Sequence, residues 1–220
     1  MSLMIDIGNT KTKYAHFVAG SIKEKGLCNT DETSKIVYDY SEKVKNIMIS
    51  SVKPIPDLVL SKPKNKDCKL VVLSSELEMP FKTRYNPPET LGPDRLALVA
   101  GAVSVFSNRS VLIIDVGTCI TFDFVDSKKN HLGGSISPGL QMRLNALENQ
   151  TSALPIVNLR EPQELIGSTT ENSILSGVVN GATKELDGII DTYKKRYPET
   201  LVVITGGDAC FFDKKLKNSI

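Results

Sequence analysis

The chain has 220 residues, of which 40% are hydrophobic and 24% are charged, an ordinary balance for a globular protein of one large or two small domains. A formal net charge of +2 is too small to indicate a nucleic-acid-binding protein. The four cysteines include no Cys-x-x-Cys pair and only two histidines are present, so zinc binding is not expected.

Neither a secretory leader nor an apolar run of membrane length is visible, and scattered cysteines are typical of a reducing compartment. We therefore expect a cytoplasmic protein with no membrane partner. The densest basic run, residues 62–69, contains no aromatic residue, which favours a solvated loop over a nucleic-acid surface.

The first half of the chain begins with an apolar strand that ends in Asp6, Ile7 and Gly8, and a second apolar stretch follows at residues 14–18. Further strands are predicted at residues 46–51 and 69–73. A helix is predicted from Pro93 to about residue 106, because proline is well tolerated in the first helical turn.

The second half repeats this order. Strands are predicted from Val111, at residues 120–125 and at residues 131–137, followed by a helix that Pro138 opens and that runs to about residue 149. Apolar residues at helical spacing predict a longer helix from Thr170 to about residue 197, although three glycines interrupt it. A last strand at residues 201–204 leads into a glycine-rich turn, residues 205–209, that is predicted to open another helix.

Two segments about half a chain apart look alike. Each is an apolar strand that ends in Asp-x-Gly, at Asp6 and at Asp115, and is followed by a threonine and a second apolar stretch. This spacing indicates an ancient duplication rather than a short repeat. Because strands precede helices in both halves, we expect two α/β lobes, residues 1–108 and 109–220, that face each other across a cleft.

The turn after Asp6 has the composition of a phosphate-binding turn. Residues 6–13 offer glycine backbone amides, short hydroxyl and amide donors, two lysines, and a carboxylate that suits hydrated Mg²⁺. One such turn alone is more often only a hairpin turn. Two copies half a chain apart favour a shared nucleotide site, in which Asp6 and Asp115 approach one nucleotide–metal complex.

Three further motifs are candidates for chemistry. Asp94, in Leu91-Gly92-Pro93-Asp94-Arg95, is either a helix cap or a general base that takes a proton late in phosphoryl transfer. Arg95 could pair with a carboxylate or a phosphate, or form a surface salt bridge. The glycine-rich runs at residues 133–139 and 205–209 are either simple turns or places where the backbone approaches a ligand.

These motifs occur in the order used by the acetate and sugar kinase, heat-shock chaperone and actin superfamily. Within it the chain most resembles the type III pantothenate kinases, whose five motifs are Asp-x-Gly-Asn-Thr, Gly-x-Asp-Arg, Asp-x-Gly-Thr, Gly-Gly-x-Ile-x-Pro-Gly and Thr-Gly-Gly-Asp-Ala. All five are present in order between Asp6 and Ala209. The resemblance implies a duplicated actin-like ATPase fold (ribonuclease H-like), with mixed sheets flanked by helices.

The resemblance also implies a role for each matching residue. The ATP contacts would be Asp6, Ile7, Gly8, Asn9, Thr10, Lys11, Thr12, Lys13 and Thr118. The pantothenate contacts would be Tyr85, Gly92, Pro93, Asp94, Arg95 and Thr170, with Asp94 as the catalytic base. Asp115 would bind a monovalent cation, K⁺ or NH₄⁺, and the protein would be a homodimer with the helix from Thr170 as its interface candidate.

The chain departs from the family pattern in small ways. Val52-Lys53-Pro54 stands where the family often has Ser-Val-Val-Pro, and Pro93 removes one backbone donor next to Asp94. The predicted function is ATP-dependent phosphorylation of pantothenate to 4′-phosphopantothenate, the first step of coenzyme A biosynthesis, with Mg²⁺. The alternatives are another small-molecule kinase of the same fold and a catalytically silent nucleotide-binding regulatory protein.

Overall fold

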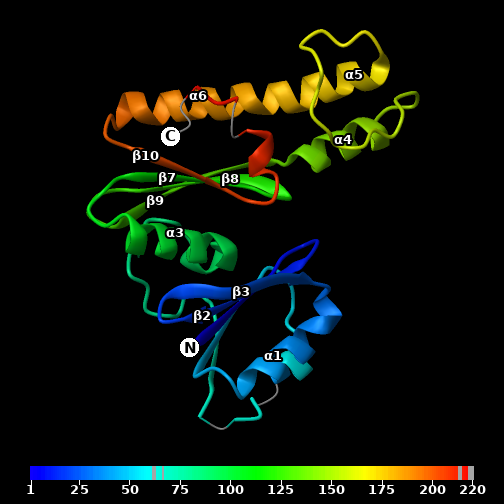
Figure 1. Ribbon diagram of the computed structural model, residues 1–220. Helices are drawn as coiled ribbons and strands as arrows, with labels where there is room; N and C mark the ends of the chain where they lie inside the picture. Colours follow the sequence, from blue (N-terminus) through cyan, green and yellow to red (C-terminus); the bar gives the residue numbers. More distant parts are fainter. Residues whose placement is uncertain (61–62, 66, 213–214, 218–220) are drawn as a thin grey trace. The chain divides into compact units, whose positions relative to one another are not determined.

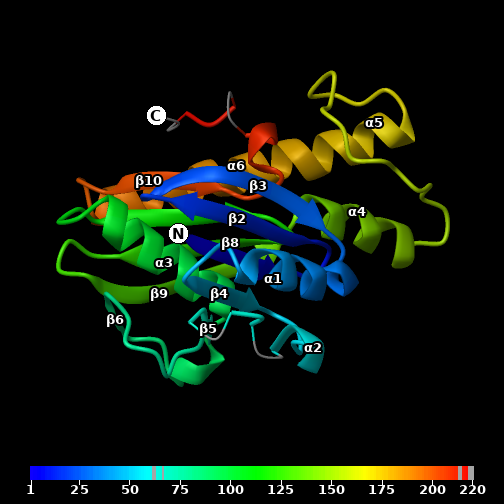
Figure 2. The same cartoon turned by 60° about the horizontal axis from the view of Figure 1, so that its bottom comes forward.

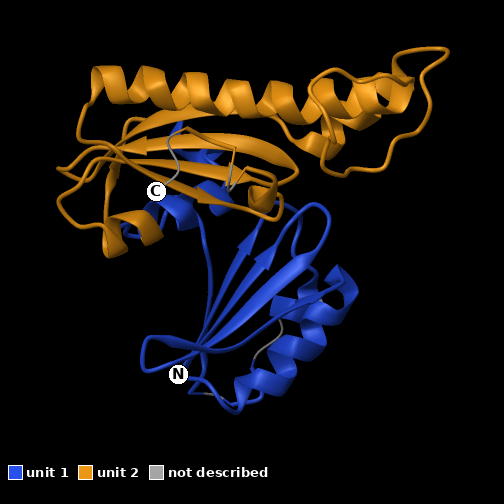
Figure 3. Ribbon diagram, turned by 45° about the horizontal axis from the view of Figure 1, so that its top comes forward, with its two compact units in different colours: residues 1–79, 86–100 blue, residues 80–85, 101–220 orange. Residues whose placement is uncertain are grey.

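The computed structural model describes residues 1–60, 63–65, 67–212 and 215–217. Lys62 and Lys66 of the basic run lie outside these residues. The chain forms two compact units: unit 1 comprises residues 1–79 and 86–100, and unit 2 comprises residues 80–85 and 101–220 (Figure 3). This division falls inside a helix, earlier in the chain than the lobe boundary expected after residue 108, which stays a prediction.

Unit 1 is built on a five-stranded mixed sheet in the order β3-β2-β1-β4-β5 (Figure 1). The strands are β1 (Ser2–Ile7), β2 (Thr12–Val18), β3 (Ser21–Cys28), β4 (Asn46–Ser51) and β5 (Lys69–Val72). The central strand β1 is antiparallel to β2 and parallel to β4. Alternate residues of β1 are buried, as one face of a half-covered sheet requires.

Helices cover the apolar face of this sheet. Figure 2 shows helix α1 (Thr33–Ser41) beside the strands of this sheet. Its residues Val37 and Tyr40 pack in one core cluster with Leu3 and Ile5 of β1 and Ile47 of β4. The short helix α2 (Asp57–Leu60) contacts α1. The single turn η1 (Thr30–Glu32) leads from β3 into α1, and η2 (Pro88–Thr90) comes just before helix α3 (Pro93–Val105).

Unit 2 is built on a second mixed sheet, in the order β10-β7-β8-β9-β6. The strands are β6 (Lys82–Thr83), β7 (Val111–Val116), β8 (Cys119–Val125), β9 (Asn130–Pro138) and β10 (Leu201–Thr205). Helix α4 (Leu140–Asn149), helix α5 (Thr170–Leu175), the π turn η3 (Ser176–Asn180) and helix α6 (Gly181–Arg196) follow β9, and η4 (Ala209–Phe211) follows β10. In Figure 1, α6 lies along one face of the sheet, where its apolar side chains join Phe122 and Phe124 in the core.

The two sheets repeat one topology. Strand β7 is antiparallel to β8 and parallel to β10, as β1 is antiparallel to β2 and parallel to β4. Strands β7, β8, β9 and β10 therefore correspond to β1, β2, β3 and β4. The prediction of a duplicated α/β fold with mixed sheets flanked by helices is confirmed.

Most predicted elements are present within one or two residues. Strand β4 has the predicted bounds, and α3 (Pro93–Val105) matches the helix predicted from Pro93. The long helix predicted from Thr170 is formed by α5, η3 and α6 in succession. The π turn contains the first of the three glycines, Gly177, and ends just before the second, Gly181.

One boundary prediction was wrong. Pro138 ends β9, because it still pairs with Cys119 across the ladder, and α4 starts at Leu140 with Gly139 as its N-cap. The helix predicted to open at residues 205–209 is the short 3₁₀ helix η4. Among the described residues, no helix is both long enough and apolar enough to span a membrane.

Candidate active site

The turn between β1 and β2 places Asp6 at a half-buried position beside a compact loop. The loop is closed by a hydrogen bond from Gly8 N to Lys11 O, at 3.2 Å. Asp6 pairs with Lys13 on β2 and with Ser50 on β4, so these three side chains share one face of the sheet. Asp6 Oδ1 is buried and has no hydrogen-bond partner among the described residues. An oxygen atom in this state is suited to bind a cation or a hydrated ion.

The electrostatic setting of Asp6 is mixed. Burial raises the pKa of its carboxyl above the usual 3.8 and Asp94 adds to the rise, whereas Ser50 and the positive charge of Lys13 act in the opposite direction. Of the two groups that lower the pKa, Ser50, the register partner of Asp6 on β4, has the larger effect, but burial outweighs both. A bound cation would therefore improve the environment of Asp6.

Lysines surround this turn. Lys11 Nζ donates to Asn29 Oδ1 at 3.0 Å, and Lys53 Nζ donates to the carbonyl oxygen of Asn9 at 2.5 Å. In the sequence, Lys53 stands out only as a departure from the family pattern. Its position could have been predicted from the parallel pairing of β4 with β1, since the ends of parallel neighbours lie side by side.

Asp94 lies in the first turn of α3 and belongs to unit 1, like Asp6. Its Oδ1 accepts a hydrogen bond from Arg95 N at 2.8 Å. A Cβ atom on Gly92 would lie 2.5 Å from the same oxygen, so glycine at this position leaves room for the carboxylate. Arg95 is only 4% exposed, which excludes the surface salt bridge considered for it.

The second hairpin, between β7 and β8, has a shorter turn that Gly117 closes by donating to Cys119 O at 3.0 Å. Two other motifs pack against it. Gly139 N donates to Thr118 O at 3.1 Å, and Asp208 N donates to Val116 O at 3.0 Å. The Asp-x-Gly-Thr, Pro-Gly and Gly-Gly-Asp motifs of unit 2 therefore meet at one end of the sheet.

These close approaches require glycine. A Cβ atom on Gly139 would lie 2.3 Å from Thr118 O, and one on Gly206 would lie 2.2 Å from Val116 O. Gly206 also has φ +105°, which side chains other than glycine rarely adopt. Burial raises the pKa of Asp208 in the same loop.

Asp115 occupies the position in β7 that Asp6 occupies in β1. It is half-buried and pairs in register with Thr121 on β8 and Thr205 on β10. One carboxylate flanked by two hydroxyl side chains on the same face is a hard oxygen donor set, which fits K⁺ better than a soft metal. No group of three or more His, Cys, Asp or Glu residues among the described residues is arranged to hold a metal ion.

Tyr85 belongs to unit 2 and lies over strand β9. Its ring is stacked on His131, with centroids 6.5 Å apart and planes 12° apart, and a Cβ atom on Gly133 would lie 3.9 Å from its ring. Thr170 is the first residue of α5 and is exposed. It lines an apolar groove of about 690 Å³ between α4 and α5, together with Leu147 and Ile174.

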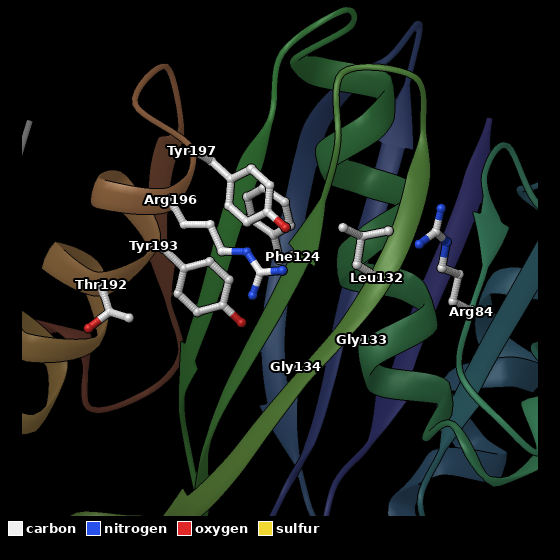
Figure 4. A pocket seen from close by; sticks show the side chains of 9 residues that line it. All are labelled: Arg84, Phe124, Leu132, Gly133, Gly134, Thr192, Tyr193, Arg196 and Tyr197. Carbon is white, nitrogen blue, oxygen red and sulfur yellow. The ribbon is translucent and has the colours of Figure 1, made fainter.

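A second cavity of about 570 Å³ lies on the α6 face of the unit 2 sheet (Figure 4). Phe124 and Leu132 line its middle, Arg196 and Tyr193 approach from α6, and Arg84 lies beyond Leu132 on the other side. Leu132 packs with Phe124 in the core beneath α6. His131 instead bonds to Asp123, which precedes Phe124 on β8 and therefore points to the opposite face of the sheet. This cavity is therefore on the face away from Tyr85.

The predicted site residues thus fall into two groups. Asp6 to Lys13 and Gly92 to Arg95 lie in unit 1, where Asp94 is close enough to Asp6 to affect its pKa. Tyr85, Asp115, Thr118 and Thr170 lie in unit 2. The approach of Asp6 and Asp115 to one nucleotide stays a prediction.

The comparison with protein families gives a clear result. The family model for type III pantothenate kinase matches residues 2–192, which is most of the chain. This chain belongs to the type III pantothenate kinase family. Curated family members from Flavobacterium johnsoniae and Bacteroides fragilis are each 40% identical to it, with 100% of this chain and 91% of each relative covered. A family member from Cytophaga hutchinsonii is 35% identical, with 100% and 92% covered.

Solved structures confirm the fold of this pantothenate kinase family member. A conserved Baf family protein from Campylobacter jejuni has a TM-score of 0.62 at 21% identity, covering 99% of this chain and 89% of that one. The ROK hexokinase from Thermus thermophilus has a TM-score of 0.52 at 13% identity, covering 95% and 82%. The predicted duplicated actin-like fold is confirmed by these similarities, which at this level of identity concern the fold alone.

Proposed function

We propose that this chain transfers the γ-phosphoryl group of ATP to the primary hydroxyl of pantothenate, giving 4′-phosphopantothenate and ADP in the first step of coenzyme A biosynthesis. The observation that carries the proposal is the pair of Asp6, with its unpartnered buried oxygen, and Asp94 at the start of α3, in a member of the type III pantothenate kinase family. The bond from the acceptor oxygen to phosphorus forms, the bond from phosphorus to the β-phosphate oxygen breaks, and Asp94 takes the hydroxyl proton.

The turn from Asp6 to Lys13 would hold the ATP phosphates, with Thr118 as a further contact. Lys53 adds a cation at this turn, because its ammonium group already lies on the carbonyl of Asn9 and has further donors to offer. Asp6 would hold Mg²⁺, which fits its unpartnered oxygen. When bound, Mg²⁺ offsets the negative charge of the phosphates.

Asp94 would act as the base through its position. In a loose phosphoryl-transfer transition state the acceptor hydroxyl loses its proton late, so a well-placed carboxylate is sufficient. The N-terminal end of a helix favours a negatively charged side chain, and the hydrogen bond from Arg95 N fixes the orientation of the carboxylate. Gly92, Pro93, Arg95 and Tyr85 would line the pantothenate side.

We also propose that Asp115 binds a monovalent cation, K⁺ or NH₄⁺. The half-buried carboxylate and its hydroxyl neighbours Thr121 and Thr205 support this assignment. When bound, the cation would offset the charge of the carboxylate near the nucleotide phosphates.

The functional form would be a homodimer in the cytoplasm. Thr170 lines an apolar groove, and three apolar side chains on the segment before α5 are also exposed, with Ile156 at 74%, Leu165 at 76% and Ile166 at 81%. An apolar groove and exposed apolar side chains of this kind favour a protein partner. A second copy of the chain would cover them and bring Thr170 to the substrate.

ADP formation by the purified protein, measured with and without pantothenate and with and without K⁺, tests the proposal. ADP release that depends on pantothenate is expected, and mass spectrometry should find phosphopantothenate in the same mixture. Asp94→Asn should lower kcat by about 10²–10⁴-fold while the protein still binds ATP. Full activity of this variant would remove the assigned base.

The same experiment separates the alternatives. A panel of sugars and short hydroxy acids in place of pantothenate identifies a kinase with another acceptor. ATP binding without acceptor-dependent ADP release would instead indicate a catalytically silent nucleotide-binding regulatory protein.

A further inference from the structure

A buried chain of polar groups lies directly behind Tyr85 in unit 2. His131 is 0% exposed and Asp123 is 1% exposed, and their Nε2 and Oδ1 atoms are 2.8 Å apart. The other ring nitrogen of His131, Nδ1, lies 2.9 Å from Thr83 Oγ1. Thr83 Oγ1 in turn accepts the backbone N–H of Tyr85 at 3.0 Å.

The backbone N–H of Tyr85 donates to the Thr83 hydroxyl. With the ring proton of His131 assigned to Nε2, the Thr83 hydroxyl donates to Nδ1 and Nε2–H donates to the Asp123 carboxylate. Both ring nitrogens are therefore engaged by protein groups. This arrangement leaves no nitrogen of His131 available for a metal ion or for a substrate proton.

Strand β6 needs such support because it is only two residues long. It pairs with β9 at Lys82 and Thr83, and its flanks add the bonds Lys82 N to Lys129 O, 3.0 Å, and Arg84 N to His131 O, 2.9 Å. So short an edge strand is weakly fixed by its ladder. The buried chain adds a hydrogen bond at Thr83 and another at Tyr85 N.

The same histidine fixes the Tyr85 ring. The ring is stacked nearly parallel on His131, while Phe81 packs edge-on against His131, with centroids 6.0 Å apart and planes 81° apart. Burying a histidine and a carboxylate costs free energy that an apolar pair of the same size would not cost. What the polar pair adds is one defined orientation for Thr83 and for Tyr85.

We propose that Asp123, His131 and Thr83 are positioning residues that hold Tyr85 in place as part of the acceptor-binding wall. The inference rests on the proposed function, because it assigns Tyr85 to the acceptor side. Disturbing the chain would loosen Tyr85 and weaken acceptor binding. The ATP-binding turn, which lies in unit 1, would keep its affinity for ATP.

Thr83→Val and Thr83→Ser form the matched pair that tests this. Valine keeps the shape of threonine but removes the hydroxyl, whereas serine keeps the hydroxyl. We expect Thr83→Val to raise the KM for pantothenate about tenfold, with kcat and the KM for ATP unchanged within about twofold. Thr83→Ser should behave like the wild type. Equal KM values for pantothenate in all three proteins would overturn the proposal.

A double-mutant cycle tests whether the effect passes through Tyr85. Tyr85→Ala should raise the KM for pantothenate at least as much as Thr83→Val. Adding Thr83→Val to Tyr85→Ala should then change nothing further, since the positioned ring is already gone. Fully additive effects would show that Thr83 acts independently of Tyr85 and would contradict the proposal.

Amide hydrogen exchange gives a readout that does not depend on activity. The Tyr85 amide should exchange faster in Thr83→Val than in the wild type and should stay protected in Thr83→Ser. If the wild type forms no ADP with pantothenate but this exchange pattern is found, the positioning chain stands and the proposed acceptor is wrong. Unchanged exchange in Thr83→Val would overturn the positioning role itself.

Discussion

The two Asp-x-Gly hairpins use one topology with different surroundings. Asp6 and Asp115 are both the penultimate residue of a central strand. In the first hairpin the register partners of the aspartate are Lys13 and Ser50, whereas in the second they are Thr121 and Thr205. The first turn is also one residue longer and is bordered by Lys11 and Lys53.

The packing around the turns differs as well. The Pro-Gly and Gly-Gly-Asp motifs place their backbone against the second turn. At Gly139 and at Gly206 there is no space for a side chain. A Cβ atom on Gly8 of the first turn would meet only Lys11 O, at 3.1 Å. These differences support the proposal that the first hairpin holds the nucleotide phosphates and Mg²⁺. The second hairpin is a tightly packed turn beside one carboxylate, that of Asp115.

Among changes at the two hairpins, the largest expected effect is that of Asp6→Asn. This change removes the charge of the carboxylate with the unpartnered oxygen, and kcat/KM should fall by about 10²–10³-fold. A titration with Mg²⁺ should show weaker metal dependence than the wild type. If Asp115→Asn loses more activity than Asp6→Asn, the assignment of the two hairpins would have to be reversed.

The next effect concerns the packing of the second turn. Gly206→Ala should lower the free energy of unfolding by about 2–3 kcal/mol, because the new methyl group collides with the Val116 backbone at an unfavourable positive φ. Gly207→Ala is the matched control, since a Cβ atom there meets nothing within 4 Å. Urea denaturation of both variants measures the difference, and equal stabilities would contradict the described packing.

A smaller effect is expected for Asp115→Asn. The wild type should be more active in KCl than in NaCl, and the variant should lose that difference, at a cost of about tenfold in kcat in KCl. Steady-state rates at constant ionic strength provide the measurement. A variant that keeps the full response to K⁺ would exclude Asp115 as the cation ligand.

The smallest effect concerns stability without ligands. The pKa of Asp6 in the folded state is raised above 3.8, so its ionised form destabilises the fold at neutral pH. This destabilisation is lost as the pH falls through the folded pKa and below the pKa of the same carboxyl in the unfolded chain. Asp6→Asn should therefore raise Tm by about 1–3 °C at pH 7 and by less near pH 4. Asp39→Asn, on the exposed face of α1, is the control and should leave Tm unchanged. A Tm gain that grows toward pH 4 would contradict this sign.

The strands and motifs of the two hairpins could be predicted because each central strand is a short apolar run that ends at a glycine turn. The duplicated topology could be predicted from the two matching Asp-x-Gly segments, at Asp6 and at Asp115. Strand β3 was missed because its sequence is polar and mostly exposed, and such a strand is held by pairing with β2 rather than by a hydrophobic pattern. Pairing of this kind is not visible in a local sequence pattern.

The surroundings of the site residues depended on long-range pairing. Ser50 and Lys53 are near the first turn only because β4 is parallel to β1. No sequence pattern gave His131 a role. Its partners Asp123 and Thr83 come from the neighbouring strands β8 and β6, so the contacts appear only once the strands are paired. The sequence pattern indicated which segments carry chemistry, and the sheet register determined which side chains meet there.

The most direct test of the account is whether one nucleotide contacts both hairpins. Paramagnetic broadening of backbone amide signals by Mn²⁺·ATP, compared with Mg²⁺·ATP, measures this in ¹⁵N-labelled protein. The account predicts strong broadening at Gly8 and at Gly117, and weaker broadening at Ser2 and Val111, which lie at the far ends of the same strands. Broadening confined to one of the two hairpins would contradict it.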